Sequence, residues 1–108
     1  MANPSKFTWT DPTTNTDGSA LGSGEVTGYL VGVRPASGTA GTYPSTALAP
    51  PTATSELVSA VAPAITASGT YFAAIQTQST SNGNSAWSSE INVVFAAAPN
   101  PPTNFSAA

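Results

Sequence analysis

The sequence contains no cysteine and no histidine, and only two basic residues, Lys6 and Arg34. Without cysteine the chain can form neither disulfides nor thiolate metal sites. Two cations cannot neutralise the phosphates that a nucleic-acid-binding surface must contact, and they are too few for attachment to anionic membranes. We therefore expect neither nucleic acid nor a membrane among its partners.

Charge of either sign is scarce. Charged residues make up 6% of the 108 residues, against roughly 25% in an average globular domain. The net charge is −3, and Thr, Ser, Ala, Gly and Asn take the place of charged residues. A surface kept soluble by hydroxyls and amides is typical of extracellular and virion-surface β-proteins. We expect a virion surface location, with an extracellular one as the alternative.

Signals for export and membrane insertion are also missing. The start, "MANPSKFTW", has no basic n-region and no apolar h-region, so it does not resemble a signal peptide. No apolar run approaches the roughly 20 residues that a membrane helix needs. If the protein acts outside a cell, we expect it to leave by another route, such as lysis during phage release.

Helical periodicity is almost absent. The one stretch worth testing is Ala53–Ala67, "ATSELVSAVAPAITA". There Leu57, Val58 and Val61 could form an apolar stripe, but Pro63 interrupts it within two turns. We predict a strand followed by a loop.

Four segments alternate between apolar and polar residues and are bounded by turn residues, which predicts β-strands. They are "KFTWT", "EVTGYLVGVR", "GTYFAAIQTQS" and "SEINVVF". Because no helices are available to carry parallel crossovers, the strands predict an all-β fold, an antiparallel two-sheet sandwich. The side chains predicted to face inward are Phe7, Trp9, Tyr29, Val31, Val33, Tyr71, Ala73, Ile75, Ile91, Val93 and Phe95, and those predicted to face outward are Phe72, Ala74, Gln76 and Gln78.

From about Ser5 to Phe95 the chain resembles a fibronectin type III domain of the bacterial and phage type. "FTWTDPTTNTDGSAL" resembles the second strand with its following loop, and "VTGYLVGVR" resembles the third strand, with Tyr29 as its core aromatic. "ITASGTYFAAIQTQ" resembles the tyrosine-corner segment, with Ile65 six positions before Tyr71. "NGNSAWSSEINVVF" resembles the final hairpin and last strand. The resemblance implies an immunoglobulin-like sandwich of fibronectin type III topology.

The sequence departs from this family at both ends. The family's first strand follows a proline-rich lead, whereas only "MANPS" precedes "KFTWT" here. The far end, "PNPPTNFSAA", resembles that missing strand. We therefore divide the chain into a sandwich over residues 1–96 and a proline-rich extension over residues 97–108. The first strand is either short or supplied by this extension.

The extension is expected to act as a donated strand or docking tail. In a type III fold the chain enters at one pole and leaves at the other, so a strand placed last is well placed to reach a neighbour. Packing back on its own sandwich, or opening a further module, are the alternatives. The candidate contact residues are Pro101, Pro102, Asn104 and Phe105.

Catalysis has little support in the sequence, and we expect no enzyme activity and no cofactor. The loop "DPTTNTDG", with Glu25 nearby, supplies oxygens that suit calcium. Its spacing is not that of an EF-hand, and a turn network around Asp17 and Gly18 is the favoured interpretation. The carboxylates available are Asp11, Asp17, Glu25, Glu56 and Glu90.

Three further side chains are considered for contact roles. Trp87 could serve as a glycan-stacking platform beside the Asn-rich loop, but packing over the edge of the sandwich is favoured. Phe72, predicted outward, is a candidate exposed contact. Arg34 is expected to lie along the sheet surface, with Glu25 or Glu90 as its partner.

These features favour a non-enzymatic structural or interaction protein. Beginning at Met1, the chain fits a one-domain phage virion accessory subunit, either a head-decoration or a tail-associated protein. Its partners would be capsid or tail proteins, or further copies of itself. The alternative is a spacer or carbohydrate-associated binding module of a secreted bacterial enzyme or adhesin, with a surface glycan as ligand.

Overall fold

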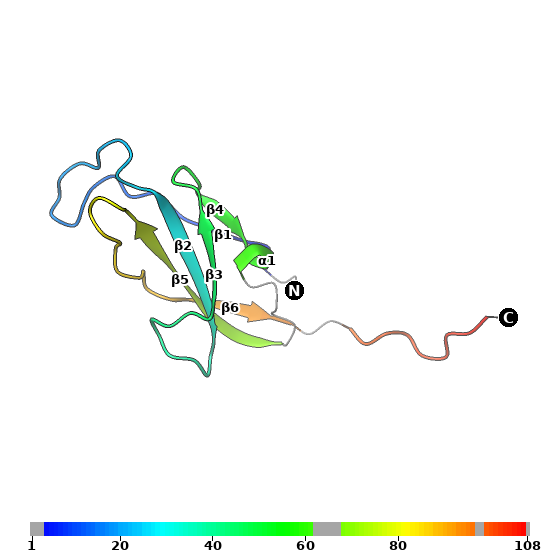
Figure 1. Ribbon diagram of the computed structural model, residues 1–108. Coiled ribbons are helices and arrows are strands. Elements are labelled where there is room, and N and C mark those ends of the chain that lie inside the picture. Colours follow the sequence, from blue (N-terminus) through cyan, green and yellow to red (C-terminus); the bar gives the residue numbers. More distant parts are fainter. Residues whose placement is uncertain (1–3, 62–67, 97–98, 108) are drawn as a thin grey trace.

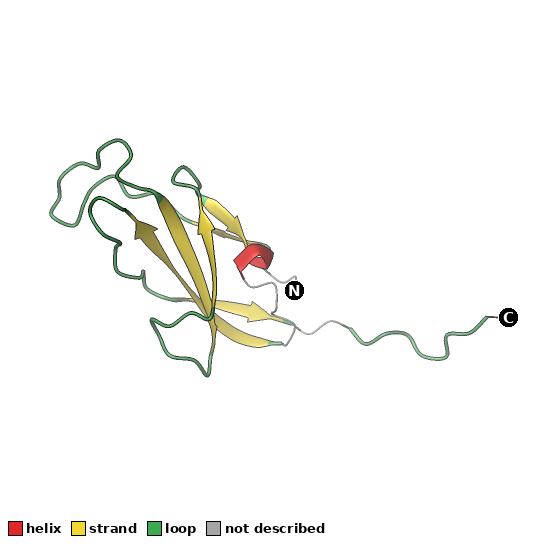
Figure 2. Cartoon of the chain, viewed as in Figure 1, coloured by secondary structure: helices red, strands yellow, loops and turns green. Residues whose placement is uncertain are grey.

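A computed structural model describes residues 4–61, 68–96 and 99–107. These residues form a mostly β fold with two antiparallel sheets and very little helix (Figures 1 and 2). The elements are β1 (Lys6–Thr8), β2 (Gly28–Pro35), β3 (Ser45–Ala49), β4 (Ser55–Leu57), α1 (Val58–Val61), β5 (Gly69–Gln78) and β6 (Ile91–Phe95). We call Lys6–Phe95 the body and Pro99–Ala107 the C-terminal segment.

The larger sheet has the strand order β3-β2-β5-β6, and the smaller sheet pairs β1 with β4. The longest ladder joins β2 to β5, from Gly28 opposite Gln78 to Pro35 opposite Tyr71. All pairings are antiparallel. The antiparallel, two-sheet part of the sequence prediction is therefore confirmed.

The core lies between the two sheets. On β2, Tyr29, Val31 and Val33 are each 2% exposed, as their alternation predicted. Phe7 of β1 packs with this face and with Val93 of β6. Trp9, predicted inward, is partly buried against the same cluster. The core thus joins the smaller sheet to the larger one through side chains from both.

The segment after β4 forms a short helix, α1, where we predicted a loop. Val58 and Val61 are both buried, because side chains three positions apart lie on the same face of a helix. Pro63 does not prevent this turn, since the helix ends at Val61. Pro63 itself, and the tyrosine-corner expectation for Ile65, lie outside the described residues.

Two residues lie on the predicted face of the larger sheet but differ in burial from what that face suggested. Ala74, predicted outward, is buried, because the outer face of the larger sheet carries a layer of side chains described below. Ile91, predicted inward, is 55% exposed, because it lies where the space between the sheets opens to solvent.

The C-terminal segment leads away from the body (Figure 1). Its described residues are all exposed, and the molecule measures 70 × 29 × 21 Å. Across the described ranges, none of the helical structure is long and apolar enough to cross a membrane.

We predict that Phe7→Ala lowers the free energy of unfolding by about 3–5 kcal/mol, the usual effect of deleting a buried phenylalanine ring. The matched control is Phe105→Ala, which removes a ring that is 96% exposed and should change stability by less than about 0.5 kcal/mol. Urea unfolding at high dilution measures both. Equal effects of the two substitutions would contradict the described core.

Candidate interaction surfaces

Arg34 lies at the centre of a cluster on the outer face of the larger sheet. Its Nε and NH2 groups donate hydrogen bonds to the two carboxylate oxygens of Glu90, both at 2.7 Å. Its NH1 group donates to the carbonyl oxygens of Pro35 and Gly38. The guanidinium also lies 4.6 Å from the ring centroid of Phe72, in cation–π geometry. These contacts hold a charged side chain that is only 9% exposed.

Tyr43 joins the same cluster from the connection before β3. Its hydroxyl donates to Glu90 at 2.8 Å, and its ring packs against Trp87 with centroids 4.6 Å apart. Gly32 permits this, since a Cβ added there would lie 2.7 Å from the Cβ and Cγ of Tyr43. The outer-face cluster is thus Arg34, Tyr43, Phe72, Trp87 and Glu90.

The cluster shifts the proton affinities of its own members. Hydrogen bonds from Arg34 lower the pKa of Glu90 below its ordinary value of 4.5. Burial, and then the hydrogen bond to Glu90, raise the pKa of Tyr43. The guanidinium of Arg34 and the hydroxyl of Tyr43 both donate to the Glu90 carboxylate, so the cluster fastens β2, the β3 approach and the β6 approach together.

These positions resolve several sequence expectations. Arg34 has Glu90 as its partner, not Glu25. Phe72 is half-buried beneath Arg34 instead of standing exposed. Trp87 is half-buried against Tyr43, which agrees with the packing interpretation. No local sequence pattern indicates the Tyr43–Glu90 contact, because the two residues lie 47 positions apart.

The Asp11–Asp17 loop forms hydrogen-bonded turns. The Oδ1 atom of Asp17 accepts from the N–H and hydroxyl of Ser19, which lowers the pKa of Asp17. This is the Asx-type turn that was predicted, and Gly18 within it has a φ of 89°. Asp11 accepts a hydrogen bond from the indole N–H of Trp9. Within the described ranges no three acidic, His or Cys side chains gather as a metal site would require.

A second surface lies where the two sheets separate. An apolar hollow of about 110 Å³ opens there, and we call it the seam groove. Its lining includes Phe7 of β1, Trp9 just after that strand, Ile75 of β5 and Ile91 at the start of β6. The sequence offered one clue to the groove. Ile91 was predicted to face inward, while the family's first strand was missing from the start of the chain.

The open edge of β1 borders the seam groove. The Val58 N–H donates to the Ser5 carbonyl and the Trp9 N–H donates to the Thr54 carbonyl. Hydrogen bonding alternates along an antiparallel strand, so the backbone groups of Lys6 and Thr8 point away from β4. On the other side, α1 follows β4 and contacts β3. The free edge of β1 therefore lies toward β6.

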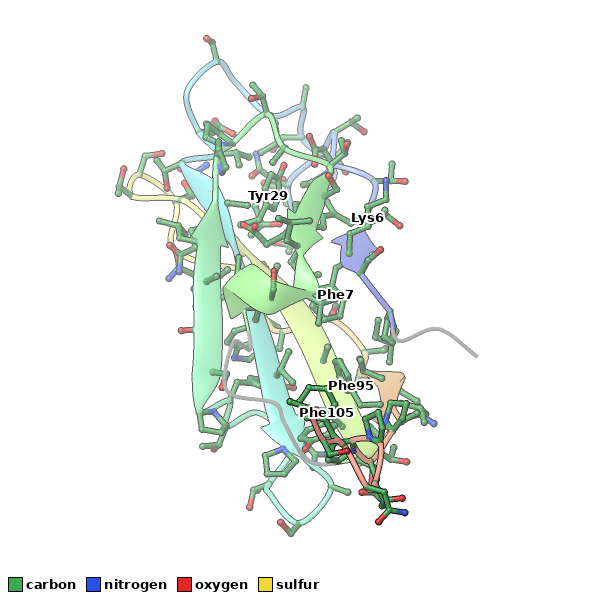
Figure 3. The ribbon with its side chains drawn as sticks, turned by 90° about the vertical axis from the view of Figure 1, so that its right-hand side faces the viewer. Lys6, Phe7, Tyr29, Phe95 and Phe105 are labelled. Atoms are coloured by element: carbon green, nitrogen blue, oxygen red, sulfur yellow. The ribbon has the colours of Figure 1, made fainter. Side chains whose placement is uncertain are left out.

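The candidate residues of the C-terminal segment do not meet the body. Pro101, Pro102, Asn104 and Phe105 are all exposed. Asn104 has a φ of 58°, in the left-handed region that asparagine tolerates, and this bends the segment just before Phe105. Figure 3 looks along the segment, so that Phe105 is drawn in front of the end of the body that carries Phe95.

Comparison with protein-family models, curated proteins and solved structures found no match to this chain. The described part of the chain is mostly β, with antiparallel sheets of two and four strands.

We predict that Glu90→Gln destabilises the body near neutral pH and that this loss shrinks in acid. Because the folded-state pKa of Glu90 is lowered, its contribution is complete above the ordinary value of 4.5 and disappears as the pH falls through the folded-state value. The measurement is a double-mutant cycle with Arg34→Met, followed by urea unfolding as a function of pH. A coupling between the two substitutions that persists unchanged in strong acid would contradict the ion pair.

Proposed function

We propose that this chain is a non-enzymatic structural or interaction protein, built on a fibronectin type III-like domain, that serves as a phage virion accessory subunit. Head decoration or a tail-associated position both fit. One observation carries the proposal: the body leaves the edge of β1 open, while the C-terminal segment presents Phe105, 96% exposed, away from the body. Both features are suited to contacts with other protein subunits.

The strand order supports the type III part of the proposal. Immunoglobulin-like sandwiches place strands A, B, E and D in one sheet and C, F and G in the other, with C′ added beside C in variable-type domains. Assigning β1 as strand B makes β2, β3, β4, β5 and β6 strands C, C′, E, F and G. The observed orders β1-β4 and β3-β2-β5-β6 then agree with the neighbours in that scheme. Strands A and D have no counterpart among the described strands.

The bonding of the carboxylates supports a non-enzymatic role. Asp11 accepts from Trp9, Asp17 from Ser19, and Glu90 from Arg34 and Tyr43. A general acid at neutral pH needs a raised pKa, whereas the pKa values of Asp17 and Glu90 are lowered. These groups are arranged to hold turns and strands.

The virion assignment is supported by composition and by the resemblance to bacterial and phage members of the family. With 6% charged residues, the surface consists mainly of hydroxyl, amide and small apolar groups. Capsid or tail proteins, or copies of this chain, are the proposed partners, and the virion surface is the proposed location.

A second candidate function is a spacer or carbohydrate-associated module of a secreted bacterial enzyme or adhesin. Two observations favour it. Three of the four residues Pro99–Pro102 are proline, a composition that makes semi-rigid spacers. The Tyr43–Trp87 ring pair also offers an aromatic surface of the kind that sugars stack on.

We expect the chain among the proteins of purified virions, detected by mass spectrometry, and its gene beside capsid or tail genes. A reading frame that continues into a hydrolase would contradict the proposal and support the spacer function.

We also expect no signal from the chain on a glycan array, because the Tyr43 and Trp87 rings pack on each other. Binding that Trp87→Ala abolishes, while Phe105→Ala leaves it intact, would favour the carbohydrate-associated function.

A further inference from the structure

We infer that the C-terminal segment of one copy docks as an added strand along β1 of a second copy and inserts Phe105 into its seam groove. The chain then assembles head to tail. This inference rests on the proposed role as an interaction protein and names its partner, a second copy of the same chain. It joins two features that the described residues leave uncovered, the groove with its strand edge and the ring of Phe105.

The acceptor offers both hydrogen bonds and an apolar site. The backbone N–H and C=O groups of Lys6 and Thr8 point to the open edge, so a strand laid beside β1 can pair with four groups. Next to that edge, the seam groove exposes Ile91 to solvent. A strand placed there would widen the smaller sheet of β1 and β4, so that it covers more of the larger sheet.

The groove has the size and chemistry to accept an aromatic ring. Its volume is about 110 Å³, and it is partly open to solvent. This is less than the roughly 150 Å³ of an enclosed apolar cavity that holds benzene, but an open groove does not have to enclose the whole ring. Its lining includes the apolar side chains of Phe7, Trp9 and Ile91, together with Ser88 and Ser89. An apolar ring is therefore preferred there over a charged group, which would lose its hydration.

The donor has matching properties. Pro99–Ala107 carries no charged residue, and Phe105 is its one aromatic side chain. At 96% exposed, Phe105 has the largest exposed fraction of the large apolar side chains in the described residues. β1 has only three residues, so backbone pairing gives few hydrogen bonds and the ring has to supply much of the affinity.

The geometry of the segment favours a second copy over its own body. Docking in cis would require the chain to reverse direction soon after Phe95. Pro99, Pro101 and Pro102 instead favour an extended, semi-rigid run, and the segment leads away from the body (Figure 1). A donor on one copy and an acceptor on the next form a heterologous contact, which closes into a ring or continues as a filament.

Two substitutions separate the donor from the acceptor. Phe105→Ala removes the inserted ring and leaves β1 intact. Thr8→Pro blocks the edge of β1, and it removes an N–H that points away from β4, so the β1–β4 ladder is kept. Leu48→Ala is the control, because Leu48 is an apolar residue of β3 that is 60% exposed and does not line the groove.

The experiment measures mass against concentration by analytical ultracentrifugation of the full chain, up to about 1 mM because an interface this small binds weakly. Wild type and Leu48→Ala should grow into rings or longer chains. Phe105→Ala should weaken association roughly 10- to 100-fold, the effect of losing one buried phenylalanine ring. Mixing the Phe105→Ala and Thr8→Pro proteins should give a heterodimer that grows no further.

A second measurement guards against misfolding of Thr8→Pro. A synthetic peptide of residues 99–107, added to the Phe105→Ala protein, should perturb the NMR signals of Lys6, Thr8 and Ile91 and leave those of Tyr43 and Glu90 in place. The same peptide carrying Phe105→Ala should bind roughly 10- to 100-fold more weakly.

Three results would overturn the inference: a wild-type monomer at every concentration, assembly that Phe105→Ala leaves unchanged, or protection of the Lys6 and Thr8 amides in a dilute monomer, which would mean docking in cis. The two proposals fail separately. A monomeric chain found in virions removes the head-to-tail contact and keeps the virion function. A chain that self-assembles, but whose reading frame continues into a hydrolase, keeps the head-to-tail contact and removes the virion function.

Discussion

The antiparallel ladder between β2 and β5 determines what the rest of the body has to cover. It runs from Gly28 opposite Gln78 to Pro35 opposite Tyr71 and forms the middle of the larger sheet. A sheet in this position has two faces that need protection from water or a polar covering. The inner face meets β1, β4 and α1, whereas the outer face meets side chains that come largely from loops. The remaining elements each cover part of one of these two faces.

The outer face is closed by a charge pair. Gly32 and Ala74 are small, and Tyr43 lies directly on Gly32. Arg34 and Glu90 then bind each other and the groups around them, so a buried cation is fully compensated. Arg34 is one of the two basic residues of the chain. Its contacts hold the loops that cover the outer face in a single arrangement. The inner face has no equivalent closure, because the smaller sheet has two strands for a larger sheet of four.

The sequence predicted the parts that depend on local pattern. The alternation through Tyr29, Val31 and Val33 placed β2 and its buried face, and Gly18 marked a real turn. Helix α1 was missed because we expected Pro63 to exclude a helix, whereas the single turn Val58–Val61 lies before it. The Tyr43–Glu90 contact and the seam groove were missed for another reason. Each depends on segments far apart in sequence, and the groove further depends on the absence, among the described residues, of a strand on the second edge of β1.

The open edge of β1 is also built to limit indiscriminate pairing. It is three residues long and carries Lys6, two features that protect exposed edges from aggregation. A short edge binds an incoming strand too weakly to hold it unless a side chain adds to the contact, and the apolar groove supplies the place for one. On the proposed virion surface many copies would lie close together, and a weak contact repeated between neighbours would become strong through effective concentration. The same proposed contact would leave isolated copies separate in dilute solution, so that assembly would depend on the particle gathering them.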